Sequence, residues 1–214
     1  MKLFSKIALG SIVLAQFFWS CKTEDNSQAM DSNFITVSAE ENFPVMVEQF
    51  ADLKVLRYQI PGWENLTLKE QKLVYYLTKA GLSGRDIMWD QNYRHNLTIR
   101  KALESVYANF GGDKSTAEWA AFEVYLKRVW FSNGIHHHYS NAKMKPDFSS
   151  KYLTSILTAS NTVLEGEAFE VIFNDKDAKK VNQAKDVDNV AASAVNFYGP
   201  GVTNADVESF YSKI

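Results

Sequence analysis

Residues 115–134 read STAEWAAFEVYLKRVWFSNG and predict the central helix of this protein. The stretch Ser115-Thr-Ala-Glu118 has the form of a capping box, in which the cap hydroxyl and Glu118 satisfy backbone N–H groups reciprocally. Behind it, one helical face carries the apolar side chains Trp119, Phe122, Leu126, Val129 and Trp130. Gly134 predicts the end of the helix, because glycine adopts the left-handed conformation that closes many helices.

Two more helices are expected before this one. Thr67-Leu-Lys-Glu70 is another capping box, and the helix that it opens is predicted to end at Gly81 or Gly84. Apolar residues then recur at helical spacing over residues 93–110. Between these two helices, the polar stretches Gly84-Arg-Asp86 and Trp89-Asp-Gln-Asn92 are interpreted as turns.

Helices are also expected after the central one. A short helix is predicted after Pro146, and residues 168–173 (AFEVIF) fit a strand or a helical turn equally well. Thr203 caps a last predicted helix whose apolar stripe reaches Ile214. Natural domains more often end with a cap and a few polar residues, so we expect the chain to be cut at its C-terminus.

The composition is that of an ordinary globular protein. Of 214 residues, 46% are apolar and 22% charged, which excludes a wholly disordered chain and a polytopic membrane protein. The formal net charge is -2, so no basic excess offers itself to nucleic acid. One cysteine excludes an internal disulfide and a cysteine-rich zinc site. The sequence predicts a mainly α fold in one or two domains.

The N-terminus predicts export. Lys2 and Lys6 precede a mostly apolar run of thirteen residues, Ile7 to Trp19, which is too short to span a bilayer. Residues 1–20 therefore resemble a bacterial lipoprotein signal, with Cys21 as the lipidated first residue of the mature chain. The alternative is an uncleaved anchor or a buried helix in which the cysteine is incidental.

Residues 21–42 are polar, lack a sustained apolar period and are interpreted as a tether between the lipid and the folded part. The acidic pair Glu24-Asp25 resembles, weakly, the surface-export signals of some bacterial lipoproteins. We therefore expect a lipid anchor in the bacterial cell envelope, on the outer membrane or the cell surface. The folded part is expected to begin at residue 43.

Local motifs for catalysis are absent from the sequence. No His-Glu-x-x-His zinc motif, phosphate-binding glycine loop or nucleophile elbow occurs. The three adjacent histidines, His136 to His138, cannot easily point at one metal ion in a regular backbone. They fit a polar loop after a helix C-terminus, a wall of a substrate cleft, or a two-histidine metal site.

Three long strings resemble the bacterial branch of the dipeptidyl peptidase III family of zinc exopeptidases. They are residues 47–62 (VEQFADLKVLRYQIPG), 84–93 (GRDIMWDQNY) and 122–140 (FEVYLKRVWFSNGIHHHYS). A fainter likeness continues through Lys180-Val-Asn182, Ala192–Tyr198 and Gly201-Val-Thr203. The resemblance covers about residues 44–214.

The resemblance implies a two-lobed peptidase that binds short peptides between a zinc-bearing lobe and a lower lobe. Residues 43–214 would form the helical beginning of the lower lobe, in a complete protein that is α+β. The family's zinc motif, His-Glu-x-x-Gly-His with a Glu from a following helix, does not occur in this chain. The missing C-terminal zinc lobe would therefore supply the catalytic residues and the zinc, and this segment would bind no metal.

The resemblance also implies where substrate would lie. The family segment that matches Tyr139-Ser-Asn-Ala-Lys143 has an aromatic residue beside the site for the substrate's N-terminal side chains. Tyr139 is therefore the candidate substrate-binding residue, with Asn133 and His138 as weaker neighbours. The structural alternative is that these residues merely shape a loop. Two rival functions remain open: a stand-alone, non-catalytic peptide-binding lipoprotein, and an adaptor that shares only the scaffold.

Overall fold

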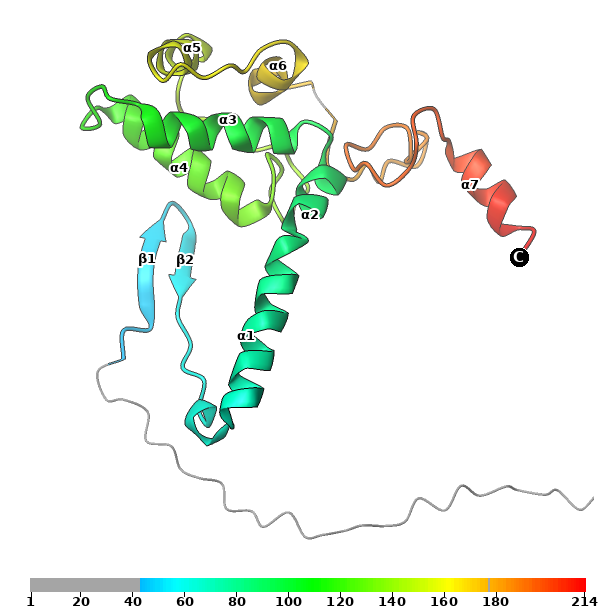
Figure 1. The fold of residues 1–214 in the computed structure, drawn as a ribbon. Coiled ribbons are helices and arrows are strands. Elements are labelled where there is room, and N and C mark those ends of the chain that lie inside the picture. Colours follow the sequence, from blue (N-terminus) through cyan, green and yellow to red (C-terminus); the bar gives the residue numbers. More distant parts are fainter. Residues whose placement is uncertain (1–42, 177) are drawn as a thin grey trace, which may run out of the picture. The chain divides into compact units, whose positions relative to one another are not determined.

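Two long helices form the centre of the fold (Figure 1). The structure is a computed structural model that describes residues 43–176 and 178–214. Helix α3 (Asn96–Asn109) packs against helix α4 (Ala117–Ser132), as the apolar spacing of both predicts. Helices α5 (Ser150–Ala159) and α6 (Glu167–Phe173) both pack on α3. The described chain is mainly helical, which confirms the predicted mainly α class.

The core lies between these helices and is rich in aromatic rings. Its largest fully buried side chains are Trp89, Ile99, Leu103, Trp119, Phe122, Leu126, Ile135, Leu153, Ile156 and Ile172. Trp119 is stacked with Phe110, whose ring centroid lies 4.8 Å away, and with Tyr107 at 6.2 Å. Offset ring pairs of this kind add to the hydrophobic burial that stabilises the core.

A β-hairpin precedes the helices and was not predicted from the sequence. Strands β1 (Met46–Phe50) and β2 (Leu53–Leu56) pair antiparallel, with an irregularity in register between Met46 and Glu48. Two ion pairs attach the hairpin to α4: Glu48 with Lys127, and Asp52 with Arg128 at 2.5 Å. The first string of the family resemblance, residues 47–62, covers most of this hairpin, whereas the second, residues 84–93, lies outside it.

Helix α1 (Leu68–Ser83) confirms the first predicted capping box. Thr67 Oγ1 accepts from the N–H of Glu70, whose carboxylate accepts from the N–H of Thr67 at 2.7 Å. Gly84 ends the helix. The interpretation of the next two polar stretches as turns was wrong, because residues Arg85–Asn92 form helix α2. Their polarity reflects a helix that buries Trp89 and Asn92 and leaves its other residues exposed or partly exposed.

Two helices begin at slightly different residues from those predicted. The N-cap of α4 is Thr116, which accepts from the N–H of Trp119 at 3.2 Å, rather than Ser115. Ser115 instead donates to the carboxylate of Asp113, both from its N–H and from its hydroxyl. The ambiguous residues 168–173 lie in α6, so the helical alternative is correct. The short helix predicted after Pro146 begins later, behind its cap Ser149.

The C-terminal segment returns to the helical centre before it ends in a helix. Asn196 N–H donates to the carbonyl of Gln91 at 2.8 Å, at the end of α2. Helix α7 (Asn204–Tyr211) follows, and its predicted cap Thr203 forms a capping box with Asp206.

A further short 3-10 turn, Trp63–Asn65, precedes α1. Within residues 43–176 and 178–214, none of the helices has the length and apolar character needed to span a membrane.

The predicted signal sequence, Cys21 and the tether lie outside the described residues. The expectations of a lipid on Cys21 and of cleavage before it therefore stay predictions.

Candidate functional site

The C-terminal end of α4 is a sharp chain reversal that positions the candidate residues. Asn133 closes the helix in the left-handed conformation, with φ 52°, and Gly134 follows with φ 148°. Non-glycine residues adopt positive φ rarely, and asparagine is the residue that tolerates it best. The reversal turns the chain from α4 into the loop that contains the three histidines.

The side chain of Asn96, at the start of α3, holds this reversal in place. Its buried side chain accepts from the N–H of Ile135 at 3.1 Å and donates to the carbonyl of Trp89 at 3.2 Å. A Cβ atom on Gly134 would lie 2.2 Å from the Asn96 amide, so only glycine fits at this point. One amide group therefore joins the start of α3 to α2 and to the chain just after the reversal.

The histidine loop is braced at its base. His136 is buried and its Nε2–H donates to the carbonyl of Ala178 at 2.9 Å. Residues His136 and Lys143 face each other across a short antiparallel bridge, and Met144 N–H donates to the carbonyl of Ile135 at 2.8 Å. This short ladder closes the loop and holds its tip at a defined place.

The tip of the loop carries a run of neighbouring rings. His138 lies 4.9 Å from the ring of Phe131 and 4.3 Å from the ring of Tyr139. Its Nδ1 is buried without a hydrogen-bond partner in the described part of the chain. Desolvation, with a smaller contribution from the charge of His137, lowers the pKa of His138 below its usual 6.5. The environment thus favours a neutral imidazole, which presents a ring face and can accept or donate a hydrogen bond.

Tyr139 is 84% exposed, the largest exposure of any aromatic side chain among the described residues. Two of the three predicted site residues, His138 and Tyr139, therefore meet at the loop tip. Asn133 does not join them through any hydrogen bond: its Oδ1 accepts from Arg85 Nη2 at 3.3 Å and its carbonyl accepts from Asn92 Nδ2 at 3.0 Å. The geometry gives Asn133 the role of a helix cap and junction residue.

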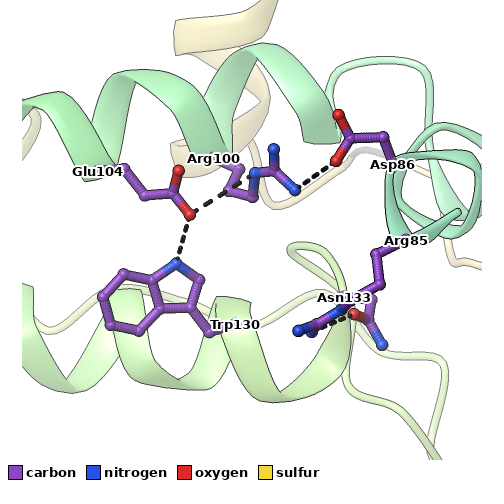
Figure 2. A network of polar contacts seen from close by, with 6 residues as sticks. All are labelled: Arg85, Asp86, Arg100, Glu104, Trp130 and Asn133. Atoms are coloured by element: carbon purple, nitrogen blue, oxygen red, sulfur yellow. Dashed lines mark hydrogen bonds and ion pairs between the residues drawn. The ribbon is translucent and has the colours of Figure 1, made fainter. Parts of the chain in front are cut away.

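A second polar group lies where α2, α3 and α4 meet, and sequence reasoning missed it (Figure 2). Arg100 Nη1 contacts Asp86 Oδ1 at 2.8 Å, and its guanidinium lies 5.1 Å from the centroid of the Trp89 ring. Trp130 Nε1–H donates to Glu104 Oε1 at 2.8 Å. Residues from three helices converge here, so the spacing within any one helix gave no signal.

The described residues offer no cluster of three or more histidine, cysteine, aspartate or glutamate side chains able to hold a metal ion. Comparisons with protein-family models and with curated proteins give no match for this chain.

Proposed function

We propose that residues 43–214 form the helical beginning of the lower lobe of a zinc-dependent dipeptidyl peptidase and supply part of its peptide-binding wall. The enzyme would remove dipeptides from the N-terminus of short peptides. The proposal rests on the resemblance of three long strings to the dipeptidyl peptidase III family. The observation that supports it best is Tyr139, a highly exposed aromatic side chain on a loop that is braced at its base.

The bracing matters because a binding residue is effective when its support holds it in place before the ligand arrives. The buried His136 and the bridge to Lys143 fix the two strands of the loop. Phe131 and His138 pack beside the tip. Tyr139 can then offer a ring face to an apolar side chain and a hydroxyl to a polar group of a peptide.

The chemical step belongs elsewhere in this proposal. Zinc and its ligands would come from a lobe outside the 214 residues, and the chain would join the membrane through a lipid on Cys21 in the bacterial cell envelope. By itself the chain is expected to bind no zinc and to release no dipeptides.

Substitution of Tyr139 tests the proposal. In the enzyme assembled with its zinc lobe, Tyr139→Ala is expected to lower kcat/KM for dipeptidyl-naphthylamides about tenfold, because a stacking contact of about 1 kcal/mol or more is lost. Tyr58 is 79% exposed in the irregular segment after β2, so Tyr58→Ala is the matched control and should leave kcat/KM unchanged. Unchanged kinetics for Tyr139→Ala would remove the assignment.

The gene beyond the codon for Ile214 decides between this proposal and its rival. A continuous reading frame that encodes His-Glu-x-x-Gly-His and a downstream Glu supports the peptidase. A stop codon would instead favour a stand-alone peptide-binding surface lipoprotein, for which the same exposed Tyr139 is the candidate contact. Binding of short peptides, without cleavage, would then be the activity to measure.

A further inference from the structure

A pocket of about 390 Å³ opens beside the polar group at the junction of α2, α3 and α4. Its walls are Leu82 at the end of α1, Trp89, Trp130 and the charged side chains shown in Figure 2. Small-molecule sites in proteins commonly have such a volume and combine apolar walls with a few polar groups. The pocket is therefore large enough for a molecule of dipeptide size.

The charges around the pocket are equal in number but unequally paired. Asp86 and Glu104 face Arg100, which contacts Asp86 at 2.8 Å and Glu104 at 3.6 Å. One guanidinium neutralises one carboxylate, and the shorter contact goes to Asp86. Glu104 is left with the longer ion pair and with the neutral indole donor of Trp130, both through Oε1. Its Oε2 makes no hydrogen bond or ion pair within the described residues.

Arg85 carries the matching positive charge. Its one side-chain hydrogen bond in the described chain is donated by Nη2 to the neutral amide oxygen of Asn133 at 3.3 Å. A guanidinium has five N–H donors and binds carboxylates through two parallel hydrogen bonds. The pocket thus presents one surplus carboxylate, on Glu104, and one surplus guanidinium, on Arg85.

We infer that this pocket binds a small zwitterion with one free ammonium and one free carboxylate, of the size of a dipeptide. The ammonium pairs with Glu104 and the carboxylate with Arg85, while Trp130 and Leu82 cover the ligand's apolar atoms. Net neutrality of the lining explains why neither a simple anion nor a simple cation is the best match. The inference does not depend on the peptidase proposal, and the Tyr139 kinetics test that proposal separately.

Titrating the full chain with capped and free ligands tests the inference. Leu-Leu is added while the Trp130 indole N–H is followed by nuclear magnetic resonance. We expect a saturable shift, and about tenfold weaker binding for both N-acetyl-Leu-Leu and Leu-Leu-amide, because each lacks one charge-assisted contact. Free leucine serves as the shorter zwitterion and should bind more weakly than the dipeptide. Absence of a saturable shift, or equal binding of free and capped ligands, would overturn the inference.

Two variants assign the ends of the ligand. Arg85→Gln should weaken Leu-Leu binding about tenfold and abolish the difference between Leu-Leu and Leu-Leu-amide. Glu104→Gln keeps an acceptor for Trp130 and should abolish the difference between free and acetylated ligand. Arg57→Gln and Glu208→Gln make the same charge changes outside the pocket and should alter neither difference. An equal effect of Arg57→Gln would overturn the role of Arg85. If Arg85→Gln does not fold, the capped ligands on the unmodified chain decide.

Discussion

At the scale of single residues, buried polar side chains join parts of the fold that the apolar core alone does not connect. Asn96 is 1% exposed, yet it is an amide that joins backbone groups of Trp89 and Ile135. Burial of an amide costs free energy unless its hydrogen bonds are made, so loss of either contact would lower the stability of the fold. Gly134 makes room for Asn96, because any larger residue at position 134 would occupy the space that the Asn96 side chain fills.

Gly134→Ala is therefore expected to lower the free energy of unfolding by about 2 kcal/mol or more. The added Cβ would meet Asn96 Nδ2 at 2.2 Å, and the φ of 148° is one that alanine rarely adopts. Gly111→Ala is the matched control, because a Cβ there meets nothing within 4 Å. Urea unfolding measures both variants. Equal stability of the two would show that the reversal after α4 can relax around a side chain.

The histidine loop should lose stability in acid. Desolvation and then the charge of His137 lower the pKa of His138 relative to the unfolded chain. The unfolded chain therefore binds a proton more readily, and the contribution of His138 is present above pH 6.5 and lost as the pH falls through the lower folded value.

Urea unfolding at several pH values measures this effect. His138→Gln should make the decline below pH 6.5 less steep than in the unmodified chain. An identical pH dependence for both would show that other groups cause the decline.

The candidate site could be predicted only in part at this scale. Tyr139 and His138 were named from the sequence because a continuous string carries them. The contacts of Asn133 to Arg85 and Asn92 could not be predicted, because they join residues 48 and 41 positions apart. The charged pocket could not be predicted for the same reason, since Asp86, Arg100 and Trp130 come from three helices.

At the scale of elements, capping residues and apolar spacing predicted α1, α3, α4 and α7 well. The hairpin was missed because its two-residue loop contains no Asn-Gly or similar signal, and Ala51 adopts the positive φ of 49° instead. Helix α2 was missed because Gly84 gives it no side-chain cap and its sequence is mostly polar. In both cases tertiary contacts, rather than local preference, fix the element.

The capping box of α1 is expected to matter locally and little globally. Thr67→Ala removes a cap hydrogen bond worth about 1 kcal/mol, but α1 buries no residue in the described chain. Amide hydrogen exchange in the first turns of α1 should speed up about fivefold, while the free energy of global unfolding stays nearly constant.

Thr78→Ala serves as the control for this helix. Thr78 lies in the interior of α1 and donates to the carbonyl of Val74, so alanine there should slow exchange through its better helix propensity. Unchanged exchange in Thr67→Ala would show that packing, and not the cap, holds the start of the helix.

At the scale of the whole molecule, apolar side chains are divided between a well-packed core and a broad exposed set. On α1, Leu73 is 58% exposed and Leu77 is 61% exposed, one turn apart. Contiguous exposed apolar residues of this kind favour association or dye binding in water. A spacing of four residues places these two side chains on one face of a helix, but that spacing alone does not tell whether the face is covered.

The double variant Leu73→Lys, Leu77→Lys tests this description. It should reduce the fluorescence of bound anilinonaphthalene sulfonate and self-association in sedimentation velocity, because it removes exposed apolar area. The melting temperature should change by less than about 2 °C, since no core contact is lost. Thr78→Lys adds charge to the same helix and should leave dye binding unchanged. A strongly lowered melting temperature would show that α1 contributes to the core.

The Asn96 junction also sets a time scale for biosynthesis. Its two partners differ in how soon they are made: Trp89 precedes Asn96 in the chain, whereas Ile135 follows it by 39 residues. At a translation rate of about 5–20 residues per second, the amide oxygen of Asn96 waits about 2 to 8 s for its partner to be synthesised. During that interval the nascent chain holds a future core amide in water, and α3 can complete its docking only after the ribosome has passed Gly134.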